Sequence, residues 1–152
     1  MKQSVIGIIL GVILLFISMI ILPTYFMSVI TYRDDLNKAQ VASRNFVDSV
    51  IDNGKISDRA ISDLNLELAA CTSTFTYKIV REEKIVQPIG NTGKVETTWM
   101  VTEITDDTQW ASGDIVTIVI EQQGLNLYQK LAMLMPGAWF HTQDVRMSGM
   151  VR

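Results

Sequence analysis

The strongest constraint on this 152-residue chain is a stretch near its amino end, residues 3–32, that carries no charged side chain. In its most apolar part, residues 4–22, fourteen of nineteen residues are Val, Ile, Leu or Phe. At roughly −0.3 to −0.6 kcal/mol each, these side chains favour bilayer insertion by about −4 to −8 kcal/mol. As a helix rising about 1.5 Å per residue, residues 3–32 would measure about 45 Å, enough for the hydrocarbon core and both interfaces. We therefore expect residues 1–32 to form a transmembrane anchor.

Two other interpretations of this apolar stretch compete with an uncleaved anchor. A cleaved secretory signal has an apolar region of roughly 7–15 residues and a small-residue cleavage site after it. Here the apolar run is far longer and leads into the sequence ITYRDD. The second alternative is a short leader that is cut after Gly7 and leaves the apolar helix in the mature protein.

The charges that flank the apolar stretch predict its orientation. Lys2 and the amino terminus precede it, whereas Arg33, Asp34 and Asp35 follow it with a net charge of −1. Because the more positive flank stays in the cytoplasm, we expect a single-pass protein of the cell membrane whose carboxyl-terminal part is extracytoplasmic. The plainest role of the Asp34–Asp35 pair is then to help fix this topology.

Three residues within the apolar stretch are candidates for helix packing. Pro23 removes one helical hydrogen bond, so it should kink the helix or mark its exit from the bilayer core. A kink there is either merely tolerated or serves packing beside neighbouring subunits. Gly7 and Gly11 have the GxxxG spacing of paired transmembrane helices, which also occurs by chance in apolar segments.

The segment that follows, residues 33–71, is predicted to hold two helices. Apolar residues recur every three or four positions over residues 34–53, which is the pattern of an amphipathic helix; they are Leu36, Ala39, Ala42, Phe46, Val47, Val50 and Ile51. No Pro or Gly interrupts residues 25–53, so this helix should continue the anchor. Gly54 should end it, and Ser57 should cap a second helix over residues 58–70.

The remainder, residues 72–152, is predicted to be a β-rich extracytoplasmic domain. Strands are expected over residues 75–86 (with a turn at 81–84 as one possibility), 94–104, 115–120 and 142–151. The sequence IVTIVI at 115–120 is the best candidate for a central strand, and residues 125–135 form either a short helix or an apolar loop. The predicted fold is α+β: the amphipathic helix packs on one face of a small, mainly antiparallel sheet.

Composition disfavours several classes of function. The net charge is −3, and residues 34–152 hold eleven Lys and Arg against sixteen Asp and Glu, which offers no basic face for nucleic acid. The single Cys71 and single His141 exclude a disulfide framework within the chain and the common zinc patterns. No Gly-rich phosphate loop, HExxH or GxSxG occurs. We therefore expect no enzyme, cofactor or metal.

Several polar or apolar clusters admit two interpretations each. The loop at residues 103–114 has four carboxylates without EF-hand spacing, so a solvated loop is preferred to a calcium site. Cys71 is expected to be a buried apolar residue, with an intermolecular disulfide as the alternative. His141 is expected to make a local hydrogen bond. The apolar residues within 131–140 form either core or a surface for a partner.

The layout resembles that of type IV pilins and pseudopilins: an apolar amino end runs into an amphipathic helix and then a small β-domain. The segment AQVASRNFVDSVIDNGKIS, residues 39–57, is similar to the post-membrane region of tight-adherence (Tad-type) minor pilin-like proteins and of related membrane proteins on bacterial conjugative elements. The resemblance covers about residues 1–70. Pilin leaders are cut after a Gly and carry a Glu five residues later, but Val12 stands at that position here. The resemblance therefore implies an anchored minor subunit rather than a major pilin.

These observations lead to two functional hypotheses. The first is a non-enzymatic subunit of a pilus, secretion or conjugation apparatus. Such a subunit would lie in the membrane or in a surface filament. Residues 4–30 would then anchor it and pack against other subunits or itself, and Phe46, Val50 and Ile51 would join helix to sheet. The second is a membrane-anchored extracytoplasmic sensor or ligand-binding module with a pocket near Trp99, Trp110 or Trp139.

Overall fold

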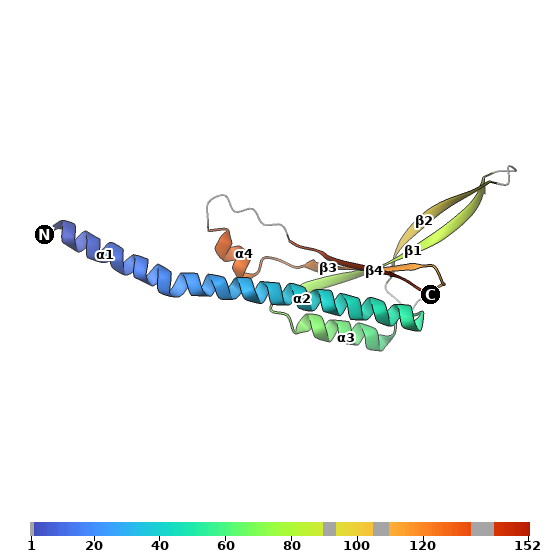
Figure 1. Ribbon diagram of the computed structural model, residues 1–152, viewed down its shortest axis with the longest axis horizontal. Helices are drawn as coiled ribbons and strands as arrows, with labels where there is room; N and C mark the ends of the chain where they lie inside the picture. The colour runs from blue at the N-terminus through green and yellow to red at the C-terminus, as the bar shows by residue number, and fades with distance from the viewer. Residues whose placement is uncertain (1, 90–93, 105–109, 135–141) are drawn as a thin grey trace. The chain divides into compact units, whose positions relative to one another are not determined.

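Helix runs without interruption from Lys2 to Asn53 in the computed structural model, which describes residues 2–89, 94–104, 110–134 and 142–152 (Figure 1). It comprises α1 (Lys2–Phe16), a π-helical turn η1 (Ile17–Ile21) and α2 (Leu22–Asn53). The prediction that the apolar and amphipathic segments are continuous is therefore confirmed. By its length and composition, this helix is long and apolar enough to cross a membrane.

The π-helical turn lies directly before Pro23 and has a simple cause. The Leu22 N–H donates to the carbonyl of Ile17, five residues back, instead of four. Pro23 has no N–H to donate to Met19 and its ring would crowd that carbonyl in a regular α-helix. The wider turn accommodates the proline. The predicted disturbance at Pro23 thus takes the form of a local π-helical turn.

The end of α2 and the start of the next helix follow the predicted caps. Gly54 adopts φ +63°, a left-handed conformation that favours glycine, and its N–H donates to the Val50 carbonyl over 2.8 Å. Helix α3 (Asp58–Ala69) begins after Ser57, whose hydroxyl oxygen accepts from the Ala60 N–H at 3.2 Å.

The sheet has four strands in the order β2-β1-β3-β4, and every pairing is antiparallel. Its strands are β1 (Phe75–Ile89), β2 (Lys94–Ile104), β3 (Ile115–Gln122) and β4 (Val145–Met150). The 115–120 segment lies between two strands, as predicted. The possible turn at residues 81–84 was wrong: β1 runs through it, because each of these residues pairs with β2, from Arg81 opposite Thr102 to Lys84 opposite Trp99.

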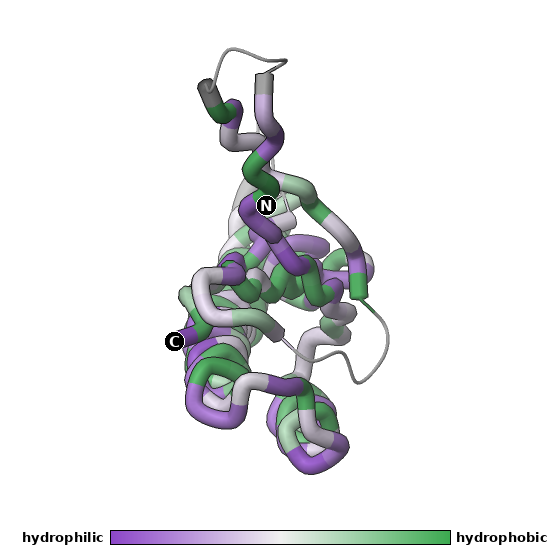
Figure 2. The backbone as a smooth tube through the Cα atoms, turned by 90° about the vertical axis from the view of Figure 1, so that its right-hand side faces the viewer, coloured by the Kyte–Doolittle hydropathy of each residue, from purple (hydrophilic) through white to green (hydrophobic). Residues whose placement is uncertain are grey.

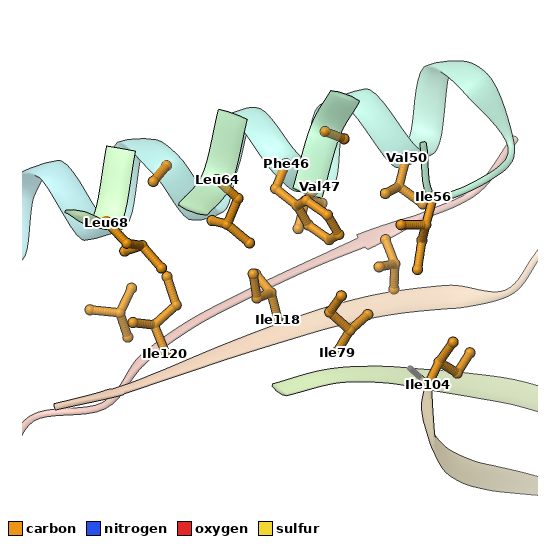
Figure 3. Packing of buried hydrophobic residues seen from close by; sticks show 14 of the residues in the cluster. Phe46, Val47, Val50, Ile56, Leu64, Leu68, Ile79, Ile104, Ile118 and Ile120 are labelled. Atoms are coloured by element: carbon orange, nitrogen blue, oxygen red, sulfur yellow. The ribbon is translucent and has the colours of Figure 1, made fainter. Parts of the chain in front are cut away.

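Helices α2 and α3 lie side by side and cover one face of the sheet (Figures 1 and 2). Their apolar side chains point towards the strands and form the core (Figure 3), whose labelled members are Phe46, Val47, Val50, Ile56, Leu64, Leu68, Ile79, Ile104, Ile118 and Ile120. Gly149 of β4 allows α2 to come close. A Cβ added there would lie 2.8 Å from Val47 Cγ1 and would overlap the end of Ile51. The α+β prediction, with an antiparallel sheet, is confirmed.

The chain divides into two compact units. One contains the described residues 35–124 and 142–152, which hold the sheet and its core. The other contains the described residues 2–34 and 125–134. In the second unit, the predicted helix or loop at 125–135 is a short helix, α4 (Leu127–Ala132).

Candidate functional site

The most exposed apolar surface in the described part of the chain is the first half of the helical run. Every residue from Val5 to Thr24 is exposed. At Gly7 and Gly11, an added Cβ would meet no atom within 4 Å. The surface that these glycines leave open is therefore not filled by any described residue of this chain.

The three other predicted packing residues lie in the folded unit around the sheet. Phe46 and Val50 are buried members of the core, and Ile51 is half-buried and packs against it. These α2 residues form the joint between helix and sheet.

Asp35 has a structural role that the sequence analysis did not predict. Its side chain is only 1% exposed, and its carboxylate accepts three hydrogen bonds from the segment between α3 and β1. Oδ1 accepts from the Thr72 N–H at 3.0 Å, and Oδ2 accepts from the N–H and the hydroxyl of Ser73, both at 2.8 Å. Because a buried carboxylate is costly unless it is hydrogen-bonded, Asp35 is a structural clamp between α2 and this segment.

Cys71 belongs to the same junction. It is half-buried rather than buried, and its thiol lies 3.8 Å from the Asp35 carbonyl and 3.7 Å from the Glu67 carbonyl. Asp35 itself had a signal in the sequence: it precedes Ala39 by four residues and so lies on the buried stripe of the helix.

The expected solvated loop before β3 is also wrong for its described part, residues 110–114. Trp110 is buried in the core and its backbone N–H donates to the Gly54 carbonyl at 3.0 Å. Asp114 is buried, pairs with Arg81 at 2.6 Å (Oδ2 to Nη2) and accepts from the Ala111 N–H at 2.8 Å. The Arg81 guanidinium lies 5.7 Å from the Trp110 ring centre, within cation–π range. These contacts make Trp110 and Asp114 part of the packed structure, whereas Ala111 and Ser112 between them are exposed.

Asp106 and Asp107 lie outside the described residues, as do Met135, Trp139, Phe140 and His141. Among the residues that the structure describes, no group of three His, Cys, Asp or Glu side chains is placed to hold a metal ion.

A second exposed apolar surface lies on the outer part of the β1–β2 hairpin, which we call the hairpin arm (residues 82–89 and 94–101). Strand β3 pairs with β1 only as far as Glu82, so beyond it the sheet has two strands, and Figure 1 shows them projecting past β3 and β4. One face of the arm carries the predicted stripe Val95, Thr97, Trp99 and Val101. All four are exposed, Trp99 by 43% and Val101 by 64%.

Of the two described tryptophans near which a pocket was expected, Trp110 lies in the core and Trp99 is exposed on the arm. A hollow of about 640 Å³ lies between α2 and α3. Its polar lining residues include Asn45, Asn53, Lys55, Arg59, Asp63 and Glu67. Asn45 Nδ2 donates to Glu67 Oε1 across it at 3.2 Å.

Comparison with known proteins identifies no family for this chain. No family model, curated protein or solved structure matches the chain.

Proposed function

We propose that this protein is a membrane-anchored, non-enzymatic, minor pilin-like subunit of a bacterial cell-envelope pilus, secretion or conjugation apparatus. The observation that carries the proposal is the division of labour along one helical run. Its first half exposes only apolar or small uncharged side chains from Val5 to Thr24, and its second half supplies part of the core under an antiparallel sheet. The resemblance of residues 1–70 to pilin-like proteins supports the same function.

The apolar half acts as the anchor and as a lateral packing surface. A bilayer removes its exposed side chains from water, which is worth about −4 to −8 kcal/mol. The open face at Gly7 and Gly11 allows a second helix to approach closely. Neighbouring subunits, or a second copy of this chain, would supply that helix.

The hairpin arm is the contact surface that we assign to the outer domain. Strand β2 is an edge strand, so its outer backbone groups are open to pairing. Its segment 97–102, TTWMVT, has no charge and a high β-propensity, which natural proteins usually protect on an edge. An assembly partner paired with β2 would provide that protection.

Cross-linking with mass spectrometry on membranes of the native cell tests the assembly function. We expect cross-links from the outer domain to pilus or secretion components, and their loss in Trp99→Ser combined with Val101→Ser. Leu66→Ser is the matched control, because Leu66 is 72% exposed on α3, away from the arm. The absence of cross-links to any other subunit or to a second copy of the chain, or an unchanged pattern in the arm variant, would contradict the proposal.

The same experiment reports the mature amino terminus. A chain that starts at Ile8 is a processed pilin-like subunit, whereas an intact Met1 indicates an uncleaved anchor. Either start is compatible with the proposed anchor.

The sensor function is retained as a second candidate because of the hollow between α2 and α3. Lys55 and Arg59 line it together with two carboxylates and two amides, which is a suitable lining for a small polar ligand. A small-molecule screen by thermal shift tests this candidate, with Arg59→Gln as the variant. A stabilising ligand that loses its effect in Arg59→Gln supports it, and stabilisation that persists in this variant counts against it.

A further inference from the structure

Helix α4 is short and has a polar amino-terminal cap, but it and its flanking residues expose several apolar side chains. Asn126 and Gln129 form a reciprocal capping box, with both hydrogen bonds at 2.9 Å. Leu134 just after the helix is 81% exposed. The other exposed apolar side chains of this segment are Leu125, Leu127 and Met133. Four exposed large apolar side chains within ten residues are typical of a segment that contacts a protein or a membrane.

Aromatic stacking holds α4 against the carboxyl-terminal part of the apolar stretch, within the same compact unit. The Tyr128 ring centre lies 5.6 Å from that of Tyr25 and 5.7 Å from that of Tyr32, with the Tyr32 ring nearly parallel to it. Tyr25 and Tyr32 are seven residues apart, so they lie on one face of α2. The tyrosines therefore fix α4 beside the end of the predicted span.

Tyr128 and Lys130 are residue types that favour the boundary between lipid and water. Desolvation by burial, followed by the neighbouring Tyr25, raises the pKa of Tyr128 above its ordinary value. Tyrosine is enriched at membrane interfaces because its ring is apolar and its hydroxyl polar. Lys130, in the last turn of α4, adds a cation suited to lipid phosphates.

We infer that α4 and its flanking residues, Leu125 to Leu134, form a second membrane contact that lies in the outer interface of the bilayer. The inference rests on the proposed anchor, because it takes residues 3–32 as the span. Near the same end of the span, α2 also exposes apolar side chains, those of Phe26, Met27 and Ile30. Its occupant is lipid: the leucine and methionine side chains enter the upper acyl region, roughly 5–10 Å deep for such helices.

Depth-dependent fluorescence quenching tests this contact on the full chain. In a Cys71→Ser background, single cysteines replace Leu134, Leu14 or Leu66 and carry an environment-sensitive dye. Because Leu134, Leu14 and Leu66 are all exposed, the label displaces little protein packing. The protein is reconstituted in vesicles of phosphatidylcholine and phosphatidylglycerol that contain a nitroxide either near the headgroup or deep in the acyl chain.

We expect the label at 134 to be quenched by the shallow nitroxide, the label at 14 by the deep one, and the label at 66 by neither. If 134 behaves like 66 while 14 is quenched, the second membrane contact is overturned and the anchor stands. If 14 is not quenched either, the anchor is also contradicted. The substitution Tyr128→Ala should lower the quenching of the label at 134 and leave that of the label at 14 unchanged. Quenching at 134 equal to that of the chain with Tyr128 would contradict the role of the tyrosines.

Discussion

The two halves of the amino-terminal helical run are both helical but have opposite surroundings. In residues 5–24 the side chains are almost all apolar and all are exposed. In residues 35–53 polar residues alternate with apolar ones, yet Ala39 and Val50 are fully buried and so is the carboxylate of Asp35. Hydrophobic content alone therefore does not decide what this protein buries in its own core. The periodic placement of polar residues does, because it leaves one stripe that a sheet can cover.

The largest expected effect comes from placing charge in the exposed half. Ile13→Arg combined with Leu14→Arg should raise the free energy of membrane insertion by about 6–8 kcal/mol, which is comparable to the whole insertion energy. We expect the protein to move from the membrane fraction to the alkaline-wash supernatant. Leu66→Arg, on the exposed surface of α3, is the control and should stay in the membrane fraction.

The next largest effect is expected when a phenylalanine is replaced by alanine in the core half and not in the exposed half. Phe46→Ala removes a ring that is 2% exposed and should lower the free energy of unfolding by about 3–5 kcal/mol. Phe26→Ala removes a ring that is 61% exposed and should leave unfolding of the outer domain unchanged. Chemical denaturation of the full chain in detergent micelles measures both. Equal losses would mean that the two halves are not packed as described.

A smaller effect distinguishes the two adjacent carboxylates. Asp35→Asn replaces one acceptor oxygen by an NH₂ group that faces a donor at Thr72 or Ser73, so it should cost about 2–3 kcal/mol. Asp34→Asn changes an exposed side chain and should alter stability little. The same denaturation experiment serves, and a larger loss for Asp34→Asn would refute the assignment of the clamp to Asp35.

The smallest effect is expected on the surface of the sheet. Lys78 Nζ lies 3.1 Å from Glu121 Oε1, and this hydrogen bond raises the pKa of Lys78. A raised folded-state pKa means that the pair stabilises the fold below the ordinary lysine pKa of 10.5 and loses this contribution as pH rises through the folded value. The thermal midpoints of the wild-type chain and Lys78→Met should therefore converge above that pH. A difference that is constant with pH would exclude the ion pair as its cause.

Sequence patterns predicted the elements of this fold more fully than its tertiary contacts. The caps at Gly54 and Ser57, the change from a period of 3.6 to a period of 2, and the central strand at 115–120 all depend on neighbours in the chain. The clamp joins Asp35 to Thr72 and Ser73, which lie 37 and 38 positions further along the chain. Trp110 makes its contacts with Gly54 and Arg81, which are also distant in the chain. These partners are distant in the chain, so the sequence predicted neither contact, although the place of Asp35 on the buried stripe was visible. The acidic residues within 103–114 led instead to the prediction of a solvated loop.

Cysteine accessibility in intact native cells tests the central claim, that the apolar half spans the membrane and the core half lies outside. In a Cys71→Ser background, Leu66→Cys and Gln3→Cys are treated with a membrane-impermeant maleimide before and after permeabilisation. We predict that Leu66→Cys is labelled in intact cells, whereas Gln3→Cys is labelled only after permeabilisation or is absent because the leader was cut. Labelling of Leu66→Cys only after permeabilisation would contradict the account.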